Sequence, residues 1–320
     1  MSSTLTGVFT CGDINGIGPE ITLKAIGKLI PAKKINIKLV MPANVFEEVK
    51  RLTGIYPEPD GQFELIDIGN CDLNPGIPSK ASGRAAFEAL KTGYALCEDD
   101  HHSFLVTAPI SKYALKLAGI NFPGHTEMLA EWSGTDKFVM MFLSDNFKCA
   151  LATIHIPISS VPAALTGENI ERCLTTVKAS LNRDFSISGP NIALLGLNPH
   201  AGENGLIGTE EIDQISGVIE RFGKGVEGPF PADAFFGRKQ YLNFDIYLAM
   251  YHDQGLIPFK LLTSGSGVNY TAGLKIVRTS PDHGTAFDIA WQNKADASSI
   301  IKSVDWGKRI CFNRRLFDAG

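Results

Sequence analysis

Short apolar runs that alternate with helix-like stretches constrain the fold of this chain more than any other feature. Several of these runs end in Gly, Pro, Asn or His, and a segment of helical spacing follows. We expect strands at residues 6–11, 35–41, 103–108, 138–143, 148–156, 191–197 and 246–251. We expect helices at residues 21–30, 45–52, 81–97, 169–181 and 209–222. This alternation predicts an α/β protein with a largely parallel sheet.

The length of the chain, 320 residues, suits two domains or one large α/β unit. The boundaries are weakly marked, and the best candidates are Pro123 with Gly124 and the Gly-rich stretch Ser264–Gly267. We therefore expect a first α/β domain of residues 1–124 plus 268–320 and a second α/β domain of residues 125–267.

Composition excludes several classes of protein. The net charge is −4, so the chain lacks the basic excess of a nucleic-acid-binding protein. Its strongest apolar run, Phe138–Leu143, is far too short for a transmembrane helix, and the first residues show no signal peptide. The six cysteines are all separated by more than three residues. We expect free thiols and a location in the reducing cytoplasm.

Three histidines stand at or just after predicted strands. His155 lies in ALATIHIP, His200 follows IALLGLNP, and His252 follows IYLAMY. Ligands of open α/β sheets bind outside the carboxyl ends of the strands, so these side chains are candidates for one common site. Three imidazoles around a divalent ion leave coordination positions open for substrate. The alternative is three separate loop histidines, and spacing leaves both interpretations open.

The Gly-rich loop GDINGIGPE, residues 12–20, joins a predicted strand to a predicted helix. Its backbone N–H groups are candidates for anion binding, and a tight strand-to-helix turn is the alternative. The glycines at positions 12, 16 and 18 do not match GxGxxG, so a Rossmann dinucleotide site is not supported here.

Polar residues in two further segments are candidates for binding an anionic substrate. Lys260, Asn269 and Arg278 surround a Gly-rich stretch, where cationic side chains bind phosphate or carboxylate well. His125 and Thr126 form a pair of hydrogen-bond donors in PGHTEM. Ordinary surface charge is the alternative interpretation for the lysine and the arginine.

Seven motifs in this chain resemble, in the same order, those of the 4-hydroxythreonine-4-phosphate dehydrogenase family of vitamin B6 biosynthesis. The motifs are GDINGIGPE, PGHTEMLA, ATIHIP, GLNPHAGENGLIGTEE, GPFPADAFF, YHDQGLIPFK and VRTSPDHGTAFDIA. The resemblance covers about residues 6 to 291. The family usually reads GDPAGIGPE in the first motif, so Ile14 and Asn15 are departures from its pattern.

The resemblance implies a metal site, a substrate site and a quaternary structure. The implied ligands of one divalent metal, Zn, Co or Mg, are His155, His200 and His252. The implied contacts to a small phosphorylated substrate are His125, Thr126, Lys260, Asn269 and Arg278. The family also implies a homodimer whose active site is shared between the subunits.

A second resemblance bears on the fold and the cofactor. GDINGIGPE and HGTAFDIA are similar to the end motifs of isopropylmalate and isocitrate dehydrogenases. That likeness implies two α/β/α domains with the active site in the cleft between them. It also implies that the loop with His283, Gly284 and Asp288 holds the adenosine part of NAD or NADP. Those enzymes bind their metal through aspartates, whereas this chain offers histidines.

The family resemblance implies an NAD-dependent oxidative decarboxylation. Oxidation at C3 of 4-phosphohydroxy-L-threonine and loss of CO2 give 3-amino-2-oxopropyl phosphate, and a divalent metal lowers the pKa of the C3 hydroxyl. Asp253 and Asp233 are candidates for orienting a metal ligand or for proton transfer. Ordinary solvated or capping aspartates are the alternative.

Two other functions are compatible with these residues. One is a paralogous dehydrogenase of a four-carbon acid sugar phosphate, D-threonate or D-erythronate 4-phosphate. The other is a metal- or phosphate-binding protein without redox activity.

Overall fold

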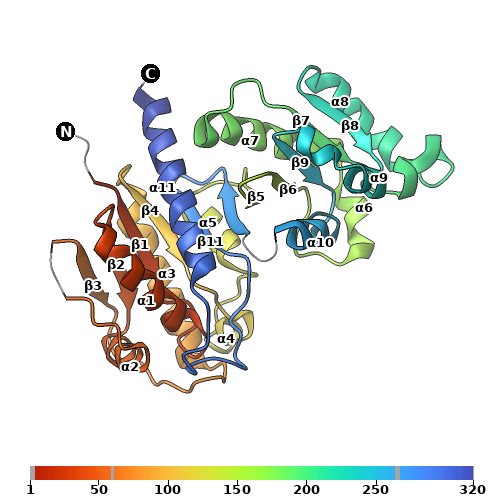
Figure 1. The fold of residues 1–320 in the computed structure, drawn as a ribbon. Coiled ribbons are helices and arrows are strands. Elements are labelled where there is room, and N and C mark those ends of the chain that lie inside the picture. Colours follow the sequence, from red (N-terminus) through yellow and green to blue (C-terminus); the bar gives the residue numbers. More distant parts are fainter. Residues whose placement is uncertain (1–3, 59–60, 264–266, 320) are drawn as a thin grey trace. The chain divides into compact units, whose positions relative to one another are not determined.

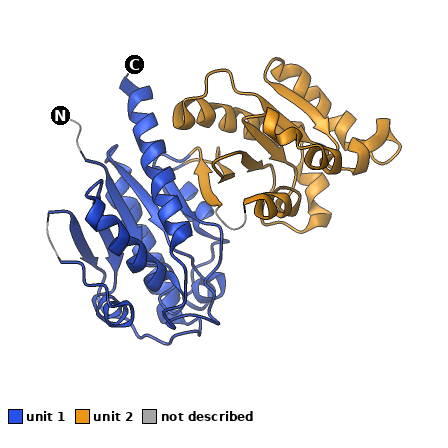
Figure 2. Cartoon of the chain, in the orientation of Figure 1, with its two compact units in different colours: residues 1–134, 274–320 blue, residues 135–273 orange. Residues whose placement is uncertain are grey.

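The computed structural model describes residues 4–58, 61–263 and 267–319. The chain forms two compact units, residues 1–134 with 274–320 and residues 135–273 (Figure 2). The expected domain limits were 124/125 and 267/268. Of the predicted boundary Ser264–Gly267, residues 264–266 lie outside the described residues.

The first unit is built on a parallel sheet with the strand order β3-β2-β1-β4-β11. Its strands are β1 (Thr6–Thr10), β2 (Asn36–Met41), β3 (Phe63–Asp67), β4 (Ser103–Thr107) and β11 (Arg278–Pro281). The helices of this unit are α1 (Gly18–Leu29), α2 (Ala43–Thr53), α3 (Lys80–Glu98), α4 (Lys112–Leu117), α5 (His125–Trp132) and α11 (Ser298–Ala319), with a 3-10 turn η1 (Ile30–Ala32).

Helices cover both faces of this sheet (Figure 1). Gly307 of α11 lies against the ring of Phe104, whereas Gly93 of α3 lies against Leu105. Successive residues of a strand point to opposite faces, so α3 and α11 pack on opposite sides. The first unit is therefore an α/β/α sandwich, and the prediction of a parallel α/β fold is confirmed for it.

The second unit has the strand order β10-β5-β6-β9-β7-β8. β5 pairs antiparallel with both β10 and β6, and the pairs β6–β9, β9–β7 and β7–β8 are parallel. β5 and β6 follow one another in the chain and form a β-hairpin. The strands are β5 (Val139–Leu143), β6 (Lys148–Leu151), β7 (Ile192–Leu195), β8 (Val226–Phe230), β9 (Ile246–Ala249) and β10 (Val268–Ala272).

Helices also cover both faces of the second sheet. Phe142 of β5 packs on Phe259 with ring centroids 5.8 Å apart, whereas Tyr270, which pairs with Met141, donates a hydrogen bond to Asp184. Met141 and Phe142 point to opposite faces of the sheet, so the helices that carry Asp184 and Phe259 pack on opposite faces.

The helices of the second unit are α6 (Val161–Ala164), α7 (Gly167–Phe185), α8 (Gly217–Phe222), α9 (Ala232–Gly237) and α10 (His252–Thr263). Short turns η2 (Ile158–Ser160), η3 (Pro199–Gly205) and η5 (Gln240–Asn243) and a π-helix η4 (Glu211–Ser216) complete this unit.

One strand prediction in this unit was wrong in extent, and one helix was not predicted. The strand predicted to run to Ile156 ends at Leu151, because the amide of Ile156 bonds locally to Ile154 rather than to a neighbouring strand. The segment after β9 is helix α10, which the sequence did not indicate because Gly255 and Pro258 both lie inside it. Within the described residues, no helix is long and apolar enough to cross a membrane.

Candidate active site

The three predicted metal-ligand segments follow three adjacent parallel strands of the second unit. β6, β9 and β7 are neighbours in that order, and their carboxyl ends lie at the same edge of the sheet. His155 lies four residues after β6, His252 three residues after β9, and His200 five residues after β7. The order of the strands therefore brings the three segments to one edge.

Hydrogen bonds from residues of the same motifs link these three segments. The Thr153 hydroxyl donates to the carbonyl oxygen of Met250 at 2.7 Å, which joins the ends of β6 and β9. The Gln254 side chain accepts from the Met250 amide at 2.7 Å and donates to the Gly196 carbonyl oxygen at 2.6 Å. The latter bond joins the ends of β9 and β7. The relative positions of the segments are thus set by side chains beside the histidines.

His155 and His252 lie close together. Their ring centroids are 6.0 Å apart, and both rings reach solvent. The Nδ1 atom of His252 lies 2.7 Å from Oδ1 of Asp253, so the carboxylate orients this ring and leaves Nε2 as the atom for a ligand. A carboxylate on the second ring nitrogen is typical of a metal-binding histidine.

His200 occupies an unusual backbone conformation and is exposed. Residues 200–204 all have positive φ, and only Gly202 among them is glycine. A left-handed conformation costs roughly 1–2 kcal/mol for each non-glycine residue. In the described part of the chain, no three His, Cys, Asp or Glu side chains are grouped so as to hold a metal. A single chain therefore gathers two of the three predicted ligands closely.

The other predicted residues of this unit lie on the elements around these segments. Asp253 is in the first turn of α10 and exposed, and Lys260 is in the last turn of the same helix, also exposed. Asn269 lies on β10, half-buried, where it pairs with Phe142. Asp233 is exposed in the first turn of α9, a helix that packs against η3 and so lies near the His200 segment.

The first unit brings together the remaining predicted substrate contacts. His125 and Thr126 form the N-terminus of α5, and Arg278 is the first residue of β11. Arg278 is 2% exposed and Thr126 is 3% exposed. The guanidinium of Arg278 donates from Nε and Nη2 to the Thr107 hydroxyl at 3.0 Å and 2.8 Å. A buried guanidinium beside a helix N-terminus is suited to an anion.

The two predicted substrate contacts of this cluster that can carry a charge, His125 and Arg278, differ in their protonation at neutral pH. Burial holds the pKa of His125 well below its ordinary value, and the charge of Arg278 lowers this pKa further. Burial lowers the pKa of Arg278 to about 9, while Glu127 acts to raise it. At neutral pH the cluster therefore pairs a neutral imidazole with a charged guanidinium.

The Nε2 atom of His125 is buried and has no hydrogen-bond partner among the described residues. Buried polar atoms are nearly always paired, so this nitrogen is a candidate for a hydrogen bond to a bound group.

The structure decides between the two interpretations of the Gly-rich loop. Four amides of this loop donate within the protein: Asp13 to Pro109, Asn15 and Gly16 to Asp13, and Ile17 to Thr285. A Cβ atom built on Gly16 would lie 2.8 Å from the Thr285 oxygen, and one on Gly18 would lie 2.2 Å from the Cys11 oxygen. The glycines thus permit close backbone packing, and the loop is a tight structural turn.

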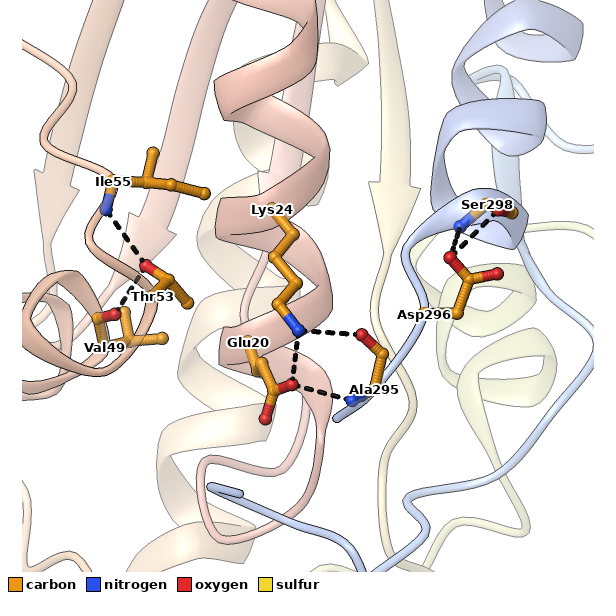
Figure 3. A network of polar contacts seen from close by, with 8 residues as sticks. All are labelled: Glu20, Lys24, Val49, Thr53, Ile55, Ala295, Asp296 and Ser298. Carbon is orange, nitrogen blue, oxygen red and sulfur yellow. Dashed lines mark hydrogen bonds and ion pairs between the residues drawn. The ribbon is translucent and has the colours of Figure 1, made fainter. Parts of the chain in front are cut away.

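Glu20, the last residue of that motif, is also engaged within the first unit (Figure 3). One of its carboxylate oxygens lies 2.8 Å from Lys24 Nζ and accepts a hydrogen bond from the Ala295 amide at 2.8 Å. Lys24 also donates to the Ala295 carbonyl oxygen at 2.9 Å. This network joins the start of α1 to the segment before α11.

The predicted cofactor loop lies against the Gly-rich turn. Thr285 accepts a bond from the Ile17 amide at 2.9 Å, and the Trp291 indole donates to the Ile14 carbonyl oxygen at 2.8 Å. Gly284 and Asp288 are exposed, and His283 is half-buried with Nδ1 at 3.1 Å from the Gly284 oxygen. The two motifs of the second resemblance are therefore neighbours in space.

Sequence reasoning missed several residues that hold these sites in place. Thr107, Thr153 and Gln254 each fix a predicted site residue or its segment through hydrogen bonds. Gln254 and Thr153 lie within the motifs YHDQG and ATIHIP, so a polar residue beside a motif histidine was the available signal. Thr107 ends a buried strand and carried no signal of its own.

Comparisons with known proteins agree with one another. A family model described as pyridoxal phosphate biosynthetic protein PdxA matches residues 18–306. A 4-hydroxythreonine-4-phosphate dehydrogenase of Prosthecochloris aestuarii is 40% identical to this chain over 334 residues, which cover 97% of this chain and 98% of that protein. A crystal structure of 4-hydroxythreonine-4-phosphate dehydrogenase from Klebsiella pneumoniae matches with a TM-score of 0.84 and 34% identity over 96% of this chain and 99% of that chain.

The likeness to a third protein concerns the fold alone. Isocitrate dehydrogenase from Methylococcus capsulatus matches 98% of this chain and 89% of its own with a TM-score of 0.50 and 15% identity. The expected isocitrate dehydrogenase-like α/β fold is thereby confirmed. Because the family model and the curated relative both extend over nearly the whole chain, this chain belongs to the PdxA family of pyridoxal phosphate biosynthetic proteins.

Proposed function

We propose that this protein is an NAD-dependent 4-hydroxythreonine-4-phosphate dehydrogenase of pyridoxal 5'-phosphate biosynthesis. The substrate, 4-phosphohydroxy-L-threonine, is oxidised at C3 and loses its carboxylate as CO2. The C3 hydride reduces NAD to NADH, and the organic product is 3-amino-2-oxopropyl phosphate. The names of the relatives support this substrate, and the geometry of the site supports an anionic ligand.

One observation supports the proposal above all others, namely the buried cluster at the N-terminus of α5. Arg278 supplies a buried positive charge, and the buried Nε2 of neutral His125 has no hydrogen-bond partner within the described chain. Thr126 adds a buried hydroxyl. These groups complement an oxyanion of the substrate, to which guanidinium binds bidentately. Lys260 and Asn269 are proposed as further substrate contacts.

The residues of the second unit fit a divalent metal. His155 and His252 lie close together, and Asp253 orients His252 through its Nδ1 atom. We assign His155, His200 and His252 as ligands, with Asp253 as the group that orients one of them. When bound, a divalent cation polarises the oxygen at C3 and stabilises negative charge that develops there. Histidine ligation suits Zn or Co better than Mg. Asp233 is proposed for proton transfer.

The loop with His283, Gly284 and Asp288 is proposed to hold the adenosine part of NAD or NADP. Gly284 is exposed, and a Cβ built on it would meet no atom within 4 Å. The exposed Asp288 carboxylate is suited to accept hydrogen bonds from ribose hydroxyls. When bound, the nicotinamide accepts the hydride from C3.

We further propose a cytoplasmic homodimer whose subunits share each active site. Mixing two inactive variants, His252→Ala and His125→Ala, tests the sharing. If the two residues reach one site from different subunits, half of the dimers are mixed and half of their sites are intact, so about a quarter of the activity returns. Each metal ligand is paired in turn with each substrate contact. Recovery in no pairing, with a fully active monomer by sedimentation, contradicts the shared site.

The activity itself is tested by NADH formation. The purified protein is assayed with 4-phosphohydroxy-L-threonine and with D-threonate 4-phosphate, each with and without a chelator. We expect chelator-sensitive turnover of the hydroxythreonine phosphate and little of the acid sugar phosphate. Preferred turnover of D-threonate 4-phosphate would establish the paralogous dehydrogenase instead. Tight binding of a phosphorylated ligand without NADH from any substrate would indicate a binding protein.

A further inference from the structure

Residues 200–204 form a left-handed run that begins at His200. Their φ angles are 54°, 51°, 78°, 43° and 55°, and four of the five residues are not glycine. L-amino acids rarely adopt this conformation singly, and a continuous run of it is more unusual still. Such a run persists only where surrounding contacts determine it. Those contacts are therefore part of what places the His200 imidazole.

Glu211 supplies such contacts from the π-helix η4. Its side chain is buried, at 3% exposed. Oε1 accepts a hydrogen bond from the backbone amide of Asn198 at 2.7 Å, and the carboxylate oxygen Oε2 accepts one from Asn198 Nδ2 at 3.0 Å. The carbonyl oxygen of Asn198 in turn accepts a bond from the Ala201 amide at 3.1 Å. Glu211 thus fixes Asn198, which lies two residues before the left-handed run and accepts a hydrogen bond from Ala201 within it.

The same carboxylate lies directly against the backbone of Gly196, which precedes the run, and of Gly202, which lies within it. A Cβ built on Gly202 would lie 2.7 Å from Oε2 of Glu211, and one built on Gly196 would lie 3.1 Å from Oε1. Glycine suits position 202 for two reasons: its φ is 78°, and the carboxylate lies too close for a Cβ atom. The carboxylate packs between the end of β7 and the run. π-helical turns are rare and are frequent at functional sites.

We propose that Glu211 is a positioning residue for the metal ligand His200. It holds Asn198 and, through it, the left-handed run of residues 200–204, and so sets the direction from which the imidazole approaches a divalent cation. Glu210 also accepts a hydrogen bond from Asn198 Nδ2, at 2.6 Å. Of these two glutamates, it is Glu211 that accepts the hydrogen bond from the backbone amide of Asn198. The inference rests on the proposed metal site and adds a role to a residue outside the ligand set.

The variant Glu211→Gln tests this role with little change in size. Its amide accepts one of the two bonds from Asn198 and presents an N–H group to the other donor. The matched control is Asp213→Asn, because Asp213 is exposed on the same π-helix and its carboxylate accepts a hydrogen bond from the Thr209 hydroxyl at 2.6 Å. The probe is Co²⁺ alone, and binding is followed by titration against a chelating dye and by the visible absorption of the bound ion.

Glu211→Gln is expected to weaken Co²⁺ binding about 10- to 100-fold and to change the absorption spectrum of the bound ion. In the metal-free protein, amide hydrogen exchange in residues 198–208 is expected to accelerate, while exchange elsewhere is unchanged. The control should match the wild type in all three measurements. Unchanged Co²⁺ affinity in Glu211→Gln, or equal weakening in Asp213→Asn, overturns the proposal.

A measurement on the wild type alone decides the matter if the variant does not fold. The amides of Asn198 and Ala201 should exchange as slowly as core strands without any metal, and fast exchange at both overturns the proposal. A wild-type protein that binds no Co²⁺ contradicts the proposed function. The exchange measurement then still decides whether Glu211 holds the left-handed run.

Discussion

Thr107 accepts two hydrogen bonds from the guanidinium of Arg278, one from Nε at 3.0 Å and one from Nη2 at 2.8 Å. Both side chains are buried, and they come from the adjacent parallel strands β4 and β11. One hydroxyl thus fixes the orientation of the guanidinium. The pairing of β4 with β11 therefore sets the position of the buried positive charge of Arg278.

Thr107→Val tests whether this orientation matters for substrate binding. Valine has nearly the same shape but accepts no hydrogen bond, and loss of a bond to a charged group costs about 1.5–3 kcal/mol. We expect the KM for the phosphorylated substrate to rise roughly 10- to 100-fold, with the KM for NAD unchanged. Thr107→Ser, which keeps the hydroxyl, should recover most of the affinity. Equal increases in both KM values would point to general disruption of the fold.

Removing the carboxylate that orients His252 should weaken metal binding without removing a ligand. Asp253→Asn weakens the interaction with Nδ1, and loss of such a partner typically costs 10- to 100-fold in metal affinity. His252→Ala should abolish measurable binding. Competition with a chelating dye measures both, and Asp305→Asn on the exposed surface of α11 is the control. Equal metal content in Asp253→Asn and the wild type would exclude the orienting role.

The depressed pKa of His125 predicts a pH dependence of stability. Below about pH 6.5 an unfolded chain protonates this histidine, whereas the folded protein does not. The free energy of unfolding should therefore fall as the pH drops from 6.5 towards 5, by less than about 1.4 kcal/mol per pH unit from this group. His125→Asn should flatten this dependence in urea unfolding, and His102→Asn, at 41% side-chain exposure, should not. Parallel curves for all three proteins would contradict the prediction.

Asn15 is a departure from the family pattern with a structural consequence. Its Nδ2 donates to the Ile77 carbonyl oxygen at 2.8 Å, and its Oδ1 accepts from the Asn74 amide at 2.8 Å. Asn15→Ala should lower the free energy of unfolding by about 1–2 kcal/mol, since the released groups lie near solvent. Urea unfolding measures this, with the exposed Asn182→Ala as control. A change no larger than that of the control would show that the segment is held by other contacts.

Part of the fold was predictable because strong local patterns agree with the tertiary structure. The strand at residues 6–10 and the helix at residues 80–98 both show the expected periodicity, and the structure shows them with small shifts at their ends. Helix α10 was not predictable in this way. Gly255 and Pro258 disfavour a helix locally, and burial of Leu256 and Phe259 outweighs that preference.

The sequence by itself determined the family, the α/β class and the identities of the residues to examine, because short motifs record residue type and order directly. Tertiary structure alone decided how those residues are held. Thr107 and Arg278 are 171 positions apart, and Gln254 reaches Gly196 across 58 positions. Pairing of strands distant in sequence creates these contacts, and no local pattern specifies that pairing. The left-handed conformation at His200 likewise depends on the buried carboxylate of Glu211, which local preference alone would not select.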